Sequence, residues 1–493
     1  MENSVKIYRS FFDSNVVCMS NKKIGLFALT ALVLSSMIGS GIFSLPQNMA
    51  EVAGAKALLI GWAITGVGII FLGLSFFFLS RLRPDLNGGV YTYAREGFGG
   101  LVGFFSAWGY WLCSGIGSVS YLVVAFEGLG TFVDTQERII FGTGSTLYSI
   151  LGASLVVWLV HWLIARGIRE AAFVNMLATI VKVFPLILFI ILAALYFSPT
   201  QFFTDFNGET LANQNHSADL ITQVKSTMLI TLWVFVGVEG ASILSGHAKK
   251  QRDIGTATVL GICITLVLYV AITVLALGVL PRETISTMSN PSMAPILESM
   301  IGKVGKVIIT FCLIVYVLGS YISWTMYCTE VPYRGVESEA FPRMLSKLNK
   351  NNTPINSLWF TNIVIQLCLI LVLFTSQSYT KLISLATSMI LVPYILIGAY
   401  LFKLALQRKA KWYIQLTGLM ATLYGLWIVY AAGMDYLFLS VVLYVPGVTV
   451  YLYSQYQKKG KFGLSKKEWA LLIILIGVFL MACWELSQGL LSI

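Results

Sequence analysis

Charged residues are scarce in this chain of 493 residues. They make up 11% of the sequence, whereas hydrophobic residues make up 57%. This composition excludes an ordinary soluble domain and is typical of a protein that crosses a membrane many times. We therefore expect an all-α polytopic membrane protein whose surroundings are the lipid bilayer.

Histidine and cysteine are also rare, with three and seven residues. The cysteines stand singly, without a CxxC pair, and no histidine has an acidic or cysteine partner at a catalytic or metal-ligand spacing. The sequence thus predicts no metal site, no cofactor and no disulfide framework, and it argues against a membrane enzyme.

Acidic residues are outnumbered by 33 Lys and Arg to 22 Asp and Glu, which gives a net charge of +11. Nucleic-acid binding would need the positive residues on one compact face with readout elements, and the sequence supplies none. If the N-terminal tail at 1–23 is cytoplasmic, 25 of the 33 positive residues fall on that side, as the positive-inside rule requires. We expect no nucleic-acid partner, and a bacterial inner (plasma) membrane protein with a cytoplasmic N-terminus.

Hydropathy predicts about thirteen spans that are long enough to cross a bilayer. They lie at residues 24–54, 57–80, 100–130, 144–165, 170–197, 226–246, 255–280, 303–330, 357–376, 379–407, 412–432, 434–455 and 469–488. Only a tight turn separates the two spans that end at 432 and 455, so twelve spans remain possible.

Two of these spans are interrupted by small residues. The first contains SSMIGSGIFS at 35–44, and the sixth contains WVFVGVEGAS at 233–242. An unwound backbone is tolerated in a membrane only where it lines a cavity or is buried in protein. Glycines can also serve close helix packing alone, but two breaks at matching places favour a transporter whose site lies where they meet.

The spacing of the breaks predicts two five-helix halves with inverted orientation. The halves would occupy 24–197 and 226–407, followed by accessory helices at 411–493. At each break, the half-helix that begins there offers amides to a carboxylate, and the half-helix that ends there offers carbonyls to an ammonium. An α-amino acid carries both groups.

Several motifs resemble those of the amino acid/polyamine/organocation transporters. They are GSGIF at 39–43, PDLNGGVYTY at 84–93 and the segment 233–239. Three further motifs are similar to those of bacterial basic amino acid antiporters of the arginine/ornithine and arginine/agmatine types. They are SLPQNMA at 44–50, RGIREAA at 166–172 and NPSMA at 290–294. The resemblance extends from about residue 22 to 455.

The resemblance implies a substrate site built from backbone and aromatic groups. Ser40 and Gly41 would give amides to the substrate carboxylate, and Ile38 a carbonyl to its ammonium. Trp233 would stack on the substrate side chain and close the site outward. The other implied contacts are Trp324, which would line the pocket, and Tyr110 and Ser384, which fall near family contact positions. A cation over a desolvated indole gains about 2 kcal/mol, although a tryptophan in a span often serves only packing or anchoring.

One position departs from the family pattern. Where the family has roughly WIGN in its third span, this chain has GIGS at 115–118. In the family that asparagine helps to bind a guanidinium, so Ser118 removes an amide acceptor and widens the pocket. The resemblance therefore leaves open whether arginine, ornithine, lysine or another amino acid is carried.

Two ionisable residues lie inside predicted spans, where a charge costs at least about 2.5 to 3.5 kcal/mol. The resemblance links Glu239 to proton-sensitive release of substrate on the inner side; alternatively, it pairs with a free amide or a cation in the break. Lys182 would take the place of a sodium ion between the first and eighth spans, or would extend from a helix end toward the cytoplasm.

We therefore expect a secondary active transporter that exchanges a basic amino acid for its metabolic product by alternating access. A proton-coupled amino acid symporter of other specificity, a channel and an amino acid sensor remain alternatives. The partners would be small-molecule substrates, amino acids or amines, and the sequence leaves open a homodimer.

Overall fold

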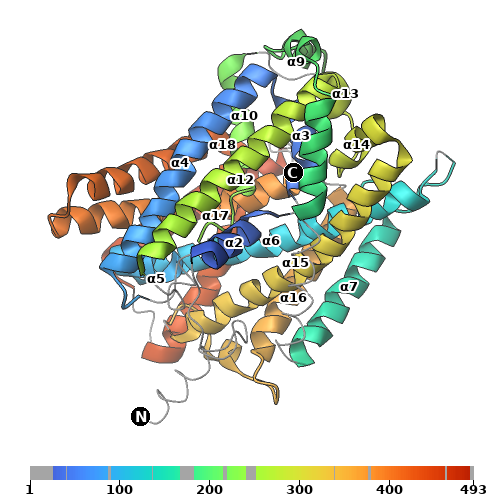
Figure 1. Ribbon diagram of the computed structural model, residues 1–493. Helices are drawn as coiled ribbons and strands as arrows, with labels where there is room; N and C mark the ends of the chain where they lie inside the picture. The colour runs from blue at the N-terminus through green and yellow to red at the C-terminus, as the bar shows by residue number, and fades with distance from the viewer. Residues whose placement is uncertain are drawn as a thin grey trace.

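The structure is a computed structural model that describes residues 26–39, 41–86, 90–135, 137–166, 183–214, 219–239, 251–337, 339–375, 379–460 and 464–488. Within these ranges the ordered elements are helices, and the only β-type pairing is an isolated bridge between Leu348 and Pro354. The expectation of an all-α fold is confirmed. Figure 1 shows the helices packed side by side in one bundle.

The helices follow one another along the chain from α2 to α19. They are α2 (Leu26–Met37), α3 (Gly41–Val52), α4 (Ala55–Leu82), α5 (Val90–Phe98), α6 (Gly100–Val133), α7 (Leu147–Arg166), α9 (Pro199–Thr204), η1 (Glu209–Gln214), α10 (Leu220–Trp233), α12 (Gln251–Val279), α13 (Arg282–Ser286), α14 (Met293–Ile301), α15 (Lys303–Glu337), η3 (Arg343–Ser346), α16 (Ile355–Thr375), α17 (Tyr379–Gln407), α18 (Trp412–Lys459) and α19 (Lys466–Ser487). A shorter apolar helix spans Val183–Leu195.

Nine of the described helices are long and apolar enough to cross a membrane. One of them, α18, has a candidate membrane span of 47 residues. At 1.5 Å per residue this span would measure about 70 Å, more than twice the thickness of a bilayer core. Its backbone leaves the helical conformation at Gly433, and in Figure 1 its two arms meet at a common turn. Residues 412–459 therefore form two helices, which supports the two separate spans that the sequence predicts there.

The break in the first span lies between α2 and α3. Residues 38 and 39 are not helical: the Ile38 amide still donates to the Leu34 carbonyl at 2.9 Å, and beyond it the Ile42 amide makes only a long bond of 3.4 Å to the Gly39 carbonyl. In the sixth span, α10 ends at Trp233 and the chain continues as a turn to Glu239. Residues 170–182 and 240–246 of the predicted fifth and sixth spans lie outside the described residues.

The centre of the bundle is formed by α6, which packs against α15 and α17. The most apolar part of α6 is 78% buried, more than that of any other described spanning helix. Such a helix has little lipid to face, so its polar and small residues are free to line a site. Both breaks reach α6, Trp233 at Gly117 and Gly39 at Tyr121, which is where a site between the halves would be expected.

Polar contacts fasten both ends of the bundle. At the end where α4 finishes, Arg83 donates to Asp85 at 2.7 Å, to Glu96 at 3.0 Å and to the Tyr400 hydroxyl at 2.8 Å. The Arg83 guanidinium holds the pKa of Asp85 below its ordinary value. These bonds tie the 84–93 motif and α5 to α17, so this motif has a structural partner in the other predicted half.

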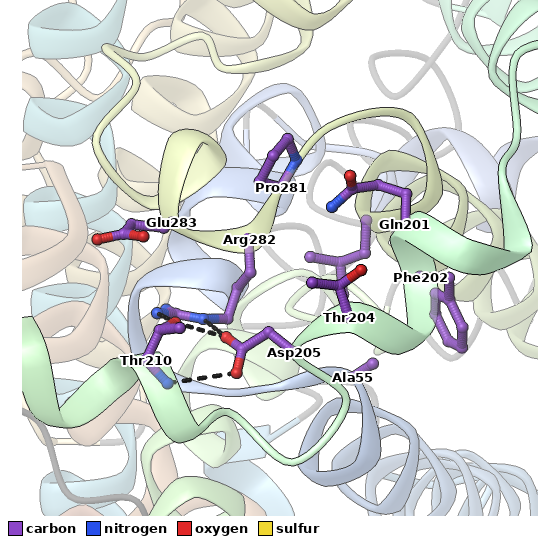
Figure 2. A pocket seen from close by; sticks show the side chains of 10 residues that line it. Ala55, Gln201, Phe202, Thr204, Asp205, Thr210, Pro281, Arg282 and Glu283 are labelled. Carbon is purple, nitrogen blue, oxygen red and sulfur yellow. Dashed lines mark hydrogen bonds and ion pairs between the residues drawn. The ribbon is translucent and has the colours of Figure 1, made fainter.

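The opposite end, where α4 begins, is fastened by Arg282 (Figure 2). Its side chain is 3% exposed and donates to Asp205 at 2.5 Å, to the Thr210 hydroxyl at 2.5 Å and to the Ala50 carbonyl at 2.6 Å. Burial by itself would raise the pKa of Asp205, but the bonds from Thr210 and Arg282 outweigh it and hold that pKa below its ordinary value. The ion pair therefore joins the last turn of α3 to two loops.

Replacing Arg282 with methionine should lower the free energy of unfolding by about 3 kcal/mol, because the Asp205 carboxylate, only 12% exposed, would be left without its partner. Lys306→Met is the matched control: its pair with Glu298 is about one-third exposed on each side, and such pairs contribute only about 0 to 1 kcal/mol. Thermal unfolding in detergent measures both. Equal melting temperatures for the two variants would contradict the structural role of Arg282.

The ion pair between Arg282 and Asp205 also predicts that the folded protein loses stability at acid pH. Since the pKa of Asp205 is lower in the folded protein than in the unfolded chain, its contribution is complete above the unfolded value and is lost as pH falls through the folded one. The wild type should therefore lose melting temperature below about pH 4, and Asp205→Asn should show a smaller acid-dependent loss.

Candidate functional site

A small cavity lies between α6, the second break and α15. Its lining residues are Cys113, Ser114, Gly117 and Tyr121 from α6, Trp233 and Val236 from the second break, and Trp324 from α15. The volume of this cavity is about 10 Å³. That is close to the room one water needs, so an amino acid can enter only if the lining side chains move.

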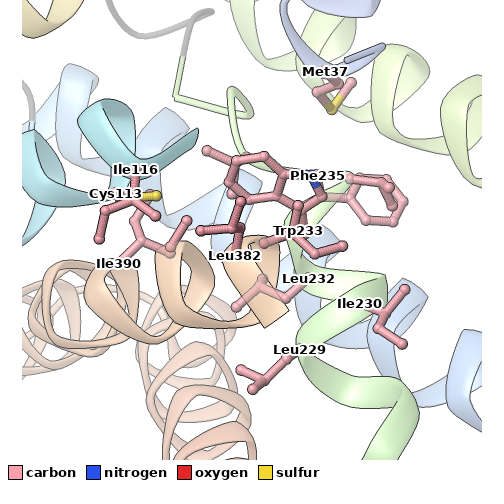
Figure 3. Close-up of a cluster of buried hydrophobic side chains, with 14 of the residues drawn as sticks. Met37, Cys113, Ile116, Leu229, Ile230, Leu232, Trp233, Phe235, Leu382 and Ile390 are labelled. Atoms are coloured by element: carbon pink, nitrogen blue, oxygen red, sulfur yellow. The ribbon is translucent and has the colours of Figure 1, made fainter. Parts of the chain in front are cut away.

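Trp233 forms one wall of this cavity and touches the first break. A Cβ atom on Gly41 would lie 2.9 Å from Trp233 Cδ1, and one on Gly117 would lie 2.6 Å from its Cη2. Trp233 is 8% exposed and sits among apolar side chains from several helices, including Ile116 and Leu382 (Figure 3). Glycine at residue 41 is therefore what lets the indole lie directly against the start of α3.

The two breaks also touch through their backbones. Gly237 has a φ of +113°, and a Cβ there would lie 2.4 Å from the Ser36 carbonyl oxygen, so only glycine fits without strain. The Ser36 hydroxyl lies 3.0 Å from the Gly237 carbonyl oxygen and 2.8 Å from that of Val33, so its one proton is shared between the backbone of the second break and that of its own helix. Close helix packing and a polar cross-link thus both occur here, and the two unwound segments form one unit.

Two tyrosines satisfy carbonyls that the breaks leave without helical partners. The Tyr269 hydroxyl lies 2.9 Å from the Met37 carbonyl oxygen and 2.8 Å from that of Val234, so its one proton is shared between the two breaks. The Tyr316 hydroxyl donates to the Ile38 carbonyl. Unwound backbone inside a membrane needs such partners. Ile38 keeps a second lone pair that could still accept from an ammonium.

Glu239 lies at the end of the described part of the second break and is 3% exposed. Its Oε1 accepts from the Tyr110 hydroxyl at 3.1 Å, and its Oε2 accepts from Tyr394 at 2.9 Å and from the Gly237 amide at 3.2 Å. Three donors on two oxygens suit an ionised carboxyl, which accepts only. A proton on either oxygen would require one of these donors to turn away, so the arrangement is sensitive to the charge of Glu239.

The structure brings several predicted site residues together and separates others. Trp233 and Trp324 line the cavity, Gly41 touches Trp233, and Tyr110 reaches the site through Glu239. Ser118 is fully buried, and its hydroxyl donates to the Ser114 carbonyl at 2.8 Å, while Ser114 and Gly117 form the lining.

Three predicted residues lie away from this cavity or outside the described part of the chain. Ser384 is buried on α17 and is not among the lining residues. Ser40 and Lys182 lie outside the described residues. Their predicted roles remain predictions.

Sequence reasoning missed the tyrosines that support the breaks, Tyr269, Tyr316 and Tyr394, as well as Tyr121 in the lining. Each sits in an apolar span in which a tyrosine resembles any other aromatic core residue. The signal that could have identified them is the phenol itself, because a buried hydroxyl usually finds a hydrogen-bond partner, and the breaks are where unpaired carbonyls are expected.

Comparison with known proteins places this arrangement in a family. The family model for amino acid permeases matches residues 24–481. The putative arginine/ornithine antiporter of Escherichia coli (strain K12) is 49% identical over 465 residues, which cover 94% of this chain and 99% of that protein.

Two further relatives cover almost as much of the chain. The arginine/ornithine antiporter of Pseudomonas aeruginosa is 41% identical over 488 residues, covering 96% of this chain and 99% of that protein. The arginine/agmatine antiporter of Chlamydia pneumoniae is 40% identical over 461 residues, covering 91% and 94%. The similarity therefore includes both breaks and the helices around them.

Proposed function

This chain belongs to the amino acid permease family of multi-pass membrane transporters, and from that premise we propose that it exchanges a basic amino acid for a related amino acid or amine. The relatives named as antiporters align with nearly its whole length. The observation that carries the proposal is the contact between the two breaks beside one cavity, with backbone groups for an α-amino acid and indoles for a cationic side chain. No covalent chemistry is involved.

The proposed site uses the first break for the main-chain end of the substrate. The start of α3 at Gly41 presents amides and a positive dipole end, which suit a carboxylate, and the Ile38 carbonyl suits the ammonium. Trp233 and Trp324 would hold the cationic side chain between them. Because the present cavity holds about one water, binding would displace Trp233 first.

Alternating access follows from how the breaks are fastened. Toward the Arg282 end, α3 continues from the first break. Its last turn is held by the hydrogen bond that Arg282 donates to the Ala50 carbonyl. Toward the opposite end, Glu239 joins the second break to α6 and α17 through Tyr110 and Tyr394. We propose that these fastenings open in turn, with the Glu239 group facing the cytoplasm and the Arg282 end facing outward.

The same proposal covers orientation and organisation. The chain would lie in a bacterial inner membrane with its N-terminus in the cytoplasm, which places the Arg83 end inside. Residues 24–197 and 226–407 would be the two inverted halves, supported by one break at the start of each.

Reconstituted protein tests the substrate class directly. Vesicles loaded with arginine, ornithine, lysine or agmatine are each offered radiolabelled arginine, and the rates rank the pairs. Fast uptake with one or more of these four, and slow uptake with neutral amino acids inside, is the expected result. Equal rates with neutral and basic counter-substrates would contradict the proposed class.

Ser118→Asn should raise arginine affinity relative to lysine. The change restores an amide beside Ser114 and Gly117, which form the α6 wall of the cavity, and an amide oxygen accepts from a guanidinium in more than one geometry. We expect a shift of about threefold to tenfold in the arginine/lysine ratio, as for one net hydrogen bond. Competition binding measures it, with Ser120→Asn as the control on the same helix; an unchanged ratio would place residue 118 away from the substrate.

A further inference from the structure

Tyrosines from three different helices converge on the first break. Tyr269 of α12 donates its hydroxyl proton toward the Met37 carbonyl, and Tyr316 of α15 donates to the Ile38 carbonyl. The hydroxyl oxygen of Tyr121, from α6, lies 3.3 Å from the position that a Cβ on Gly39 would take. Within the described part of the chain it donates to no other group, so this third phenol differs from the other two.

Tyr121 is one of the residues that line the cavity. The residue is 4% exposed, and it lines the cavity one helical turn beyond Gly117 and two beyond Cys113, as residues four apart share a helix face. The opposite walls are the rings of Trp233 and Trp324. A polar group of a ligand in this cavity would give the Tyr121 hydroxyl a hydrogen-bond partner.

The position of Tyr121 indicates which ligand group this is. Gly39 precedes α3, a helix of 12 residues whose first amides and positive dipole end attract an anion. The neighbouring carbonyls of Met37 and Ile38 already accept from tyrosines, so the Tyr121 hydroxyl is left to donate to another acceptor, such as a carboxylate. A phenol donates readily to a carboxylate, and a charge-assisted bond of this kind is stronger than a neutral one.

We propose, on the basis of the function proposed above, that Tyr121 donates a hydrogen bond to the α-carboxylate of the substrate and makes that carboxylate a requirement. A site built to hydrogen-bond a group rejects analogues that lack it, because the buried donors are then left unpaired. The protein accordingly exchanges one α-amino acid for another, as arginine for ornithine, and discriminates against the decarboxylated amine agmatine.

The test compares ligands that differ only in the carboxylate. Displacement of radiolabelled arginine from purified protein gives constants for arginine, ornithine, agmatine and argininamide, the last having an uncharged amide in place of the carboxylate. Tyr121→Phe should lower the affinity for arginine and for ornithine about tenfold or more. It should leave the affinity for agmatine and for argininamide within about twofold of the wild type. Tyr316→Phe is the control, since it acts through the Ile38 carbonyl and should weaken ligands with and without the carboxylate alike.

Two results would overturn the proposal. One is a Tyr121→Phe protein that loses affinity for all four ligands equally or for none, because a contact with the carboxylate must discriminate between them. The other is a wild type that binds agmatine as tightly as arginine. A wild type that binds neither arginine nor ornithine would instead count against the proposed function, so the two failures are distinguishable.

Discussion

A Gly41→Val protein should insert normally and lose about ten- to hundredfold in arginine affinity, the effect of forcing extra carbon atoms into a packed site. The first added atom would lie 2.9 Å from Trp233 Cδ1 and 3.1 Å from Val234 Cγ1, closer than packed atoms approach. The valine would also stand where the substrate carboxylate must meet the first amides of α3. Binding of radiolabelled arginine to purified protein measures the loss.

Gly477→Val is the matched control. Gly477 also lies in an apolar helix, but no atom is within 4 Å of a Cβ built there, so the same substitution should leave affinity and melting temperature unchanged. Wild-type affinity in a correctly inserted Gly41→Val protein would show that the first break does not hold the substrate.

Replacing Glu239 with glutamine should leave arginine binding within about threefold, the scale of one neutral hydrogen bond, while abolishing most of the pH response of exchange. Glutamine keeps the shape of the side chain but cannot take up a proton, and its amide nitrogen donates where Glu239 only accepts. Among the described residues, the titratable groups that face Glu239 are Tyr110 and Cys113 of α6, Tyr327 of α15 and Tyr394 of α17. The carboxyl is the one acidic group among them.

The measurement is the rate of exchange across a range of pH on the cytoplasmic side. Tyr394→Phe, which removes one of three donors but keeps the carboxyl, should shift the pH profile and retain a response. Glu298→Gln, a change at a carboxyl that is one-third exposed, should leave the profile as in the wild type. A Glu239→Gln profile that overlies the wild type would assign this glutamate to structure alone.

The fold class and both breaks could be predicted from the sequence because each rests on a local signal. Long apolar runs identify spans, and GSG at 39–41 or GVEG at 237–240 stands out within them. The short helices α5, α13 and α14 were not predicted, since they are only five to nine residues long and depend on tertiary contacts rather than on hydropathy.

The site was predictable where the chemistry is unusual and unpredictable where it is common. Trp233 and Trp324 were predicted from the family resemblance, and both line the cavity. Tyr394 reaches Glu239 from 155 residues away in the chain, and no pattern in one sequence indicates that pairing. For Ser118 the sequence predicted the helix in which it lies but not the direction of its side chain, because that direction depends on the packing of α6.

Obligatory exchange is the most direct test of the central claim, that the two breaks form one alternating-access site for basic amino acids. Vesicles containing the purified protein are given radiolabelled arginine outside, with unlabelled ornithine inside or with buffer alone. The account predicts rapid uptake with ornithine inside, one molecule released for each taken up, and almost none into vesicles without it. Equal uptake into empty and loaded vesicles would contradict it.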